Sequence, residues 1–204
     1  MAIELKDMMP VILAGGKSSR MGRNKAFAVI DGRPLLSLVA EKLKSWFGAP
    51  PLLVTNDQDL YACFNLPMTG DIFRGFGPLG GIHAALCASD KPHIFVAACD
   101  MPFLNKDLLC YMAMEKGNYD LVVPCGDGRP EPLYAIYSTA CRKVIEDCLK
   151  RGEKKIIVFF PKVKARYLTK AEIEQFSPDG RVFMNINTPE DLSLAESIWK
   201  IKKD

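Results

Sequence analysis

The sequence predicts an α/β fold, a Rossmann-like three-layer sandwich in which helices cover both faces of a mainly parallel sheet. Short runs of consecutive apolar residues, typical of strands buried on both faces, alternate with longer segments whose apolar residues recur at helical spacing. The chain has 204 residues, 49% of them apolar, which is enough for a sizeable core. We therefore expect residues 1–204 to form a single domain.

Strands are expected where apolar residues run without a break. Four such runs lie at 10–14, 51–55, 93–99 and 120–124. Segments 131–138 and 180–187 have the composition of further strands. The segment KKIIVFF at 154–160 also has β-type composition, but it follows a helix closely and carries basic residues, so the sequence leaves its structure open.

Helices are expected between these runs and after them. Apolar residues recur at helical spacing in 34–47, 77–89, 106–116, 139–151 and a segment that begins after Thr188. Asn105 can cap the third of these helices and Gly117 can end it. Ser138 stands at the corresponding place before the fourth, and Thr188 followed by Pro189 marks the start of the last.

Charge and cysteine content exclude several classes of protein. The net charge of +3, from 27 basic and 24 acidic residues, is too small for a nucleic-acid-binding surface. No apolar stretch approaches the length of a membrane span, and no signal peptide is visible. The seven cysteines form no CxxC pair, which favours reduced thiols over a disulfide framework or a zinc site. We expect a cytoplasmic protein that binds neither nucleic acid nor membrane.

A glycine-rich basic stretch, VILAGGKSSRMGRNKA at 11–26, follows the first strand. Gly15 and Gly16 lie where open parallel sheets bind ligands, and their backbone can turn its N–H groups toward an anion. Four cations without a carboxylate follow: Lys17, Arg20, Arg23 and Lys25. The spacing matches neither GxxxxGK[ST] nor GxGxxG. The stretch predicts a site for a polyphosphate, the alternative being a glycine turn followed by a solvated basic loop.

Carboxylates and a second glycine motif lie in other predicted loops. The strand at 93–99 ends in Asp100, whose carboxylate is placed to hold Mg²⁺, or Mn²⁺ in its place, against phosphate oxygens. The same residue can instead simply turn the chain after the strand. Gly77 opens the turn GPLGG at 77–81, which either contacts a base or ribose or only starts a helix. Asp71 in TGDIF has the character of a surface-turn residue.

Taken together, these motifs resemble those of the MobA-type molybdenum cofactor guanylyltransferases, a family of nucleotidyltransferases. The matching segments are LAGGKSSRMGRNK at 13–25, GPLGG at 77–81, CDMP at 99–102 and NINTPE at 185–190. The match runs in register from about residue 10 to the final helix. The departure is Asn24, because the family usually has Asp before the lysine that is kept here as Lys25.

The resemblance implies a nucleotide-diphospho-sugar transferase-like fold and a reaction in which GMP passes from GTP to molybdopterin. Pyrophosphate is released and a guanine dinucleotide form of the cofactor results. GTP would be bound by Leu13, Ala14, Gly15, Lys25, Asp71 and Asp100, with Asn56 aligned to a guanosine-contacting position. We add Gly16 to the backbone that binds phosphate and Gly77 to the turn that approaches the nucleoside.

The catalytic residues expected on this basis are Arg20, Lys25, Asp100 and Asn187, with Asp100 as the metal ligand. Arg20 and Lys25 would hold the triphosphate and the leaving pyrophosphate. Asn187, with Asn185 as a second candidate, would assist at the metal or the acceptor, although NINTPE is equally a strand exit and helix cap.

The acceptor side is less defined by the sequence. A pterin phosphate needs cations and a flat apolar wall. The candidates for these roles are Lys154, Lys155, the Phe159–Phe160 pair and Arg129. A basic helix face packed on a core explains the Lys154–Phe160 segment equally well. Transient contact with other cofactor-biosynthesis proteins or molybdoenzymes is a further expectation.

Rival functions are a molybdopterin cytidylyltransferase, another small-molecule nucleotidyltransferase and a non-catalytic GTP-binding module. The sequence LAGG, where cytidine-specific relatives tend to have LAAG, favours guanine.

Overall fold

An eight-stranded sheet organises the fold of this computed structural model, which describes residues 5–15 and 24–201. Along the sheet the order is β10-β7-β9-β6-β1-β4-β5, with β8 paired to β7. The strands are β1 (Met8–Leu13), β4 (Leu52–Val54), β5 (Met68–Thr69), β6 (His93–Ala98), β7 (Leu121–Gly126), β8 (Arg129–Pro130), β9 (Tyr134–Ser138) and β10 (Ala165–Leu168). The first predicted strand thus begins at Met8, where Met8 pairs with His93.

Strand directions place a ligand site at one point of the sheet. β1 is parallel to both β4 and β6, β4 is parallel to β5, and β10 is parallel to β7. β9 runs antiparallel to β6 and β7. The predicted mainly parallel α/β sheet is therefore confirmed. After β1 the chain builds β4 and β5 on one side, and then crosses to add β6 on the other. Open sheets bind their ligands at the carboxyl ends of the strands beside such a reversal, which here are β1 and β6.

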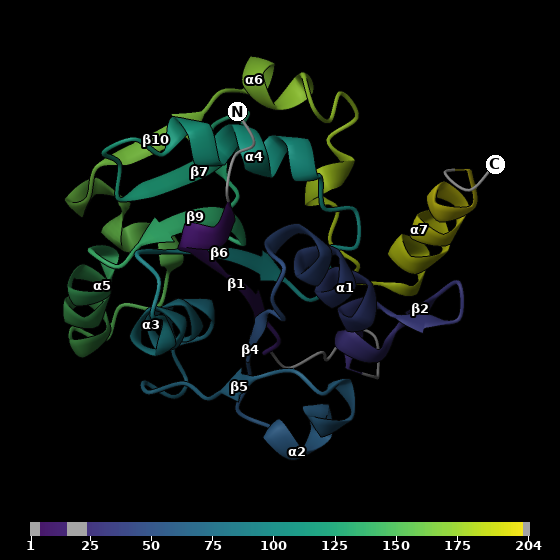
Figure 1. Cartoon of the computed structure of the whole chain (residues 1–204), viewed down its shortest axis with the longest axis horizontal. Helices are drawn as coiled ribbons and strands as arrows, with labels where there is room; N and C mark the ends of the chain where they lie inside the picture. The colour runs from purple at the N-terminus through teal and green to yellow at the C-terminus, as the bar shows by residue number, and fades with distance from the viewer. Residues whose placement is uncertain (1–4, 16–23, 202–204) are drawn as a thin grey trace.

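Helices cover both faces of the sheet, as Figure 1 shows. On one face lie α1 (Leu35–Phe47), α4 (Lys106–Glu115) and α6 (Lys170–Glu174), and on the other α3 (Pro78–Ala88) and α5 (Cys141–Lys150). The alternation of strand residues produces both cores: Ile12 packs with the first set, and Val11 and Leu13 pack with the second. All three side chains are buried.

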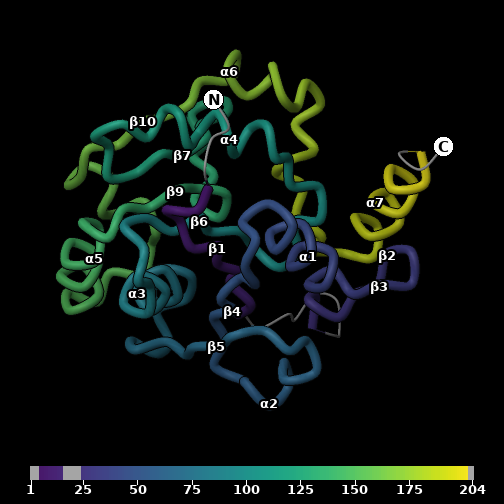
Figure 2. Tube along the Cα trace, viewed as in Figure 1, coloured from purple at the N-terminus to yellow at the C-terminus, as the bar shows by residue number. Residues whose placement is uncertain are grey.

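In a third, smaller core, the last helix packs against a hairpin from the first fifth of the chain. The helix α7 (Pro189–Ile201) lies beside the hairpin of β2 (Val29–Ile30) and β3 (Arg33–Pro34), as the trace in Figure 2 shows. Ile30, Ala195 and Ile198 are buried there. The remaining described elements are η1 (Leu5–Asp7), η2 (Lys25–Phe27), α2 (Gln58–Tyr61), η3 (Ala62–Phe64), η4 (Ile156–Lys162) and η5 (Arg181–Phe183), where η denotes a 3₁₀ helix.

Two sequence predictions about local structure were wrong. The segment 180–187 forms η5 followed by irregular chain, and no strand. The Ile186 N–H donates to the backbone carbonyl oxygen of Asp100 at 3.0 Å instead of pairing with a strand. Ser138 does not cap α5, because its hydroxyl accepts from Ala140 N–H and α5 begins only at Cys141. The segment left open at 154–160 lies largely in η4.

The predicted N-terminal cap of α4 is confirmed. Asn105 caps α4, since its side chain accepts from Leu108 N–H at 3.0 Å. All seven cysteines are free thiols. Within residues 5–15 and 24–201, no helix combines the length and apolar character that crossing a bilayer requires.

A charged network ties β10 to α4 and α6. The Arg166 guanidinium pairs with Glu115 at 3.1 Å and with Glu172. Glu172 also accepts from the Tyr111 hydroxyl at 2.7 Å and from Thr169 N–H at 2.8 Å. Burial alone would raise the pKa of Glu172, but these hydrogen bonds outweigh it and lower the pKa to about 2. The ionised carboxylate is thus stabilised by the folded state.

Replacement of this carboxylate should cost stability in a pH-dependent way. The pKa of Glu172 is depressed in the folded state, so its contribution is present above the ordinary value of 4.5 and is lost as pH falls toward 2. We expect Glu172→Gln to lower the free energy of unfolding by about 2 kcal/mol at pH 7, and by less than half of that at pH 3. Urea denaturation at both pH values, with the exposed Glu174→Gln as control, measures this. Equal losses at the two pH values would contradict it.

Candidate functional site

The carboxyl ends of β6, β1, β4 and β5 bring several predicted site residues to one edge of the sheet. Hydrogen bonds continue past the strands there: Cys99 N–H donates to Leu13 O at 3.2 Å, and Ala14 N–H donates to Val54 O at 3.0 Å. Gly15 and Asp100 therefore follow directly on neighbouring strands. This edge contains the switch point of the topology.

Three side chains from distant parts of the sequence meet beside this switch point. The Lys25 ammonium lies 3.5 Å from Asp100 Oδ2 and donates to Asn187 Oδ1. Lys25 comes from η2, Asp100 follows β6, and Asn187 stands just before α7. The bond from Ile186 N–H to Asp100 O brings the last segment into place. The arrangement joins one cation, one carboxylate and one amide.

Burial governs the electrostatics of this group. The side chain of Asp100 is 13% exposed, and loss of solvent raises the pKa of its carboxyl, against the opposing effect of Lys25. Burial, reinforced by the charge of Asp100, also raises the pKa of the neighbouring Cys99 to about 12. Charges interact more strongly in a poorly solvated place than in water. A charged substrate group bound here would therefore interact strongly with Lys25 and Asp100.

A second pair lies at the ends of β4 and β5. Asn56 Nδ2 donates to Asp71 Oδ2 at 2.7 Å, and Asp71 N–H donates to Asn56 Oδ1 at 2.9 Å. The reciprocal bonds hold the Asp71 carboxylate at the sheet edge, where Asp71 is partly exposed. It can still accept hydrogen bonds from a ligand with N–H or O–H groups.

The GPLGG turn brings α3 close to this edge. Gly77 has a φ of +59°, which disfavours any side chain. A Cβ at Gly80 would lie 2.8 Å from the carbonyl oxygen of Phe73, and one at Gly81 would lie 3.3 Å from Leu13 Cδ2. Both glycines therefore have a packing role: Gly80 lets the start of α3 approach the loop at Phe73, and Gly81 lets it approach the end of β1.

The sequence matches a described family. Residues 10–165 fit the model of the MobA-like NTP transferase domain. This chain belongs to that family.

Individual MobA-like relatives match over most of their length. A probable molybdenum cofactor guanylyltransferase of Pelotomaculum thermopropionicum is 37% identical over 185 residues, 91% of this chain and 90% of the relative. A molybdenum cofactor guanylyltransferase of Desulfosudis oleivorans is 35% identical, covering 93% and 95%. The crystal structure of molybdopterin-guanine dinucleotide biosynthesis protein A from Archaeoglobus fulgidus has a TM-score of 0.83 at 31% identity, covering 95% and 99%.

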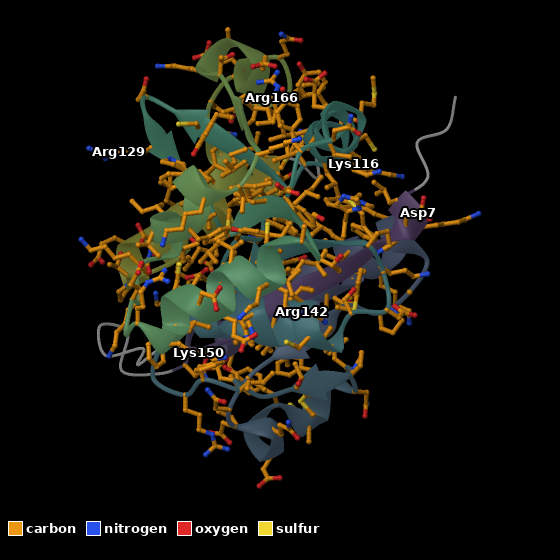
Figure 3. All side chains as sticks on the ribbon, turned by 90° about the vertical axis from the view of Figure 1, so that its left-hand side faces the viewer. Asp7, Lys116, Arg129, Arg142, Lys150 and Arg166 are labelled. Atoms are coloured by element: carbon orange, nitrogen blue, oxygen red, sulfur yellow. The ribbon has the colours of Figure 1, made fainter. Side chains whose placement is uncertain are left out.

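Not every residue expected to serve this MobA-like site lies in it. Phe159 and Phe160 are 0% and 3% exposed and belong to a core, so they do not form an acceptor wall. Lys154 lies over the Phe76 ring, 5.6 Å from its centroid. Arg129 projects outward from β8, as Figure 3 shows. The expected roles of Gly16 and Arg20, and the cations Lys17 and Arg23, fall outside the described residues.

The structure also adds residues that the sequence analysis did not name. Asp191 Oδ2 accepts from the N–H groups of Asn187 and Thr188, both at 2.9 Å. Asp191 N–H donates to Thr188 Oγ1, so the two residues cap α7 reciprocally and fix the backbone of Asn187. The order TPED was a detectable signal for this cap. Tyr61, whose hydroxyl accepts from Asn24, carried no such signal.

Proposed function

We propose that this chain is a molybdenum cofactor guanylyltransferase that transfers GMP from GTP to molybdopterin and releases pyrophosphate. The product would be molybdopterin guanine dinucleotide. The proposal is supported by relatives of that name at 35–37% identity over about nine-tenths of the chain. The observation that carries it is the placement of Lys25 and Asp100, 3.5 Å apart at the switch point of a parallel sheet.

Nucleotidyl transfer of this kind needs no nucleophilic side chain. A terminal phosphate oxygen of the acceptor attacks the α-phosphorus of GTP, and a new P–O bond forms. The bond from that phosphorus to the bridging oxygen of the β-phosphate breaks, and pyrophosphate leaves with the electron pair. Because a phosphate monoester is largely deprotonated at pH 7, no general base is needed either. Catalysis reduces to holding two anions in line and neutralising their charge.

Lys25 is the residue we assign to the phosphates. Its ammonium would bind the oxygens that become pyrophosphate and stabilise the charge that develops on them. Asn187, which accepts from Lys25, would keep that ammonium directed into the site. Arg20, together with the backbone of Gly15 and Gly16, is proposed to contact the same phosphates. Asp71, braced by Asn56, would accept from the nucleoside, with Leu13, Ala14 and Gly77 lining its path.

Asp100 suits a divalent cation. Its carboxylate is poorly solvated, and the Lys25 ammonium is its ionic partner at 3.5 Å. Within the described ranges no three His, Cys, Asp or Glu side chains gather as a metal cage. One carboxylate completed by phosphate oxygens and water is a usual arrangement for Mg²⁺. When bound, Mg²⁺ or Mn²⁺ would supply positive charge that lowers repulsion between the two anionic substrates. The Asp100 carboxylate would provide the negative charge that binds the cation, opposite the Lys25 ammonium.

A panel of nucleoside triphosphates tests the proposal. Purified protein is incubated with Mg²⁺, molybdopterin and GTP, CTP, ATP or UTP, with pyrophosphate release and mass detection of the dinucleotide as readouts. We expect GTP to be preferred at least tenfold and to yield the guanine dinucleotide. A preference for CTP would contradict the guanine assignment. Tight GTP binding without turnover would indicate a binding module instead of an enzyme.

The proposal extends to the cellular setting. Free thiols at all seven cysteines are the usual state in a reducing compartment, and we place the protein in the cytoplasm. Transient contact with other cofactor-biosynthesis proteins or with molybdoenzymes belongs to the same proposal. We further propose that residues 1–204 act as one unit.

A further inference from the structure

The short turn that carries Lys25 is attached to an element outside the site. Asn24 caps this turn: its Oδ1 accepts from Ala26 N–H at 3.1 Å, while its Nδ2 donates to the Tyr61 hydroxyl at 2.8 Å. Just past Lys25, the Phe27 ring lies 5.6 Å from the Tyr61 ring, measured between centroids. Lys25 thus stands between two residues that both contact the same tyrosine.

Tyr61 is a rigid point of attachment. It ends α2 and is 3% exposed. Its ring packs with Phe27 and with Phe64, whose centroid lies 6.2 Å away, and the two phenylalanine rings are 5.2 Å apart. Buried aromatic clusters of this kind add energy beyond the area that they bury. The Tyr61 hydroxyl is therefore held in one place relative to the sheet.

We propose that Asn24 and Tyr61 are positioning residues for the transfer reaction. Their hydrogen bond fixes the direction in which the Lys25 side chain extends from η2. It thereby holds the ammonium beside Asp100 and Asn187, where the phosphates of GTP bind. The inference rests on the function proposed above. Neither Asn24 nor Tyr61 contacts the substrate; both act through Lys25.

Local geometry explains why such a fixture matters. The η2 turn has only three residues and is closed by two backbone bonds, from Phe27 N–H to Asn24 O and from Ala28 N–H to Lys25 O. A lysine side chain is flexible, so the direction of its stem depends on the backbone that carries it. A displacement of about 1 Å at a reacting group can cost about a hundredfold in rate.

A double-mutant cycle tests this proposal. Tyr61→Phe removes only the hydroxyl, and Asn24→Ala removes the amide. We expect each to raise the dissociation constant of GTP, measured by calorimetry, and to lower kcat/KM by about tenfold. The double variant should be within about twofold of Asn24→Ala, because both changes break the same bond. Asn24→Asp should stay within about threefold of the wild type, since its carboxylate can accept from both Ala26 N–H and the Tyr61 hydroxyl.

Tyr111→Phe provides the matched control, because it removes a tyrosine hydroxyl that donates to Glu172 at 2.7 Å, in the network of α4 and α6. It should lower the melting temperature and leave GTP affinity and kcat/KM unchanged. The proposal is overturned if Tyr61→Phe behaves like this control, or if its effect persists in full in the Asn24→Ala background. If the wild type itself neither binds GTP nor transfers GMP, the proposed function fails instead.

Discussion

Asp100→Asn should abolish transfer while leaving the fold at least as stable as before. The change keeps the shape of the side chain and removes the negative charge that would hold a divalent cation, so we expect kcat to fall at least a hundredfold. Burial raises the pKa of Asp100 in the folded state, which means that the folded protein disfavours the ionised form. That cost is largest above the folded pKa and disappears as pH falls below the unfolded value. A neutral amide avoids it at every pH.

Kinetics and thermal melting at pH 7 together measure both effects. Asp90→Asn, an exposed carboxylate on the turn before β6, serves as the control and should change neither quantity. Glu172→Gln offers the opposite pattern, because its pKa is lowered and its loss should destabilise without reducing kcat. Normal turnover of Asp100→Asn with GTP and Mg²⁺ would show that the assigned mechanism is wrong.

Lys25→Met should lower kcat/KM for GTP at least a hundredfold and should also destabilise the protein. Methionine retains a similar length and removes the charge that we assign to the phosphates. It also leaves the Asp100 carboxylate, 3.5 Å away, without the cation that offsets its burial. Loss of the cation leaves an uncompensated charge on Asp100, which is the more buried partner of the pair, at 13% exposed against 24% for Lys25. We therefore expect a loss of about 1–3 kcal/mol in the free energy of unfolding.

The two effects of Lys25→Met can be separated by a second change. Lys25→Met combined with Asp100→Asn should recover most of the lost stability, because no buried charge is left over, and should recover no activity. Lys44→Met, at an exposed position on α1, is the matched control and should keep wild-type kinetics. A double variant as unstable as Lys25→Met alone would contradict the assigned pairing of Lys25 with Asp100.

The sheet and half of the site could be read from the sequence because their signals are local. Continuous apolar runs marked the strands, and Asp100 follows one of them directly. The approach of Lys25 to Asp100 and Asn187 depends instead on long-range contacts, such as the bond from Ile186 N–H to Asp100 O. No local pattern encodes such a contact. The same bond explains why 180–187 reads as a strand yet forms none: its backbone meets a loop there, not a neighbouring strand.

Amino-acid composition also gave a wrong prediction where it could not distinguish a buried core segment from a ligand-binding surface. The Phe159–Phe160 pair has the chemistry of a pterin-stacking surface, but both rings are buried in the core that also contains residues of α3 and α5. An apolar run flanked by lysines is compatible with either environment, because lysine stems can cover apolar surface while their charges stay in water. Tyr61 was missed for a related reason, since a lone tyrosine in a short helix gives no indication of the amide that its hydroxyl will meet.

A crystal structure with GTP and Mn²⁺ is the most direct test of the central claim, that Lys25 and Asp100 together receive a triphosphate and its metal. We expect anomalous scattering from Mn²⁺ within bonding distance of the Asp100 carboxylate and the phosphates against the Lys25 ammonium. Nucleotide bound at another edge of the sheet, with no metal beside Asp100, would contradict the account.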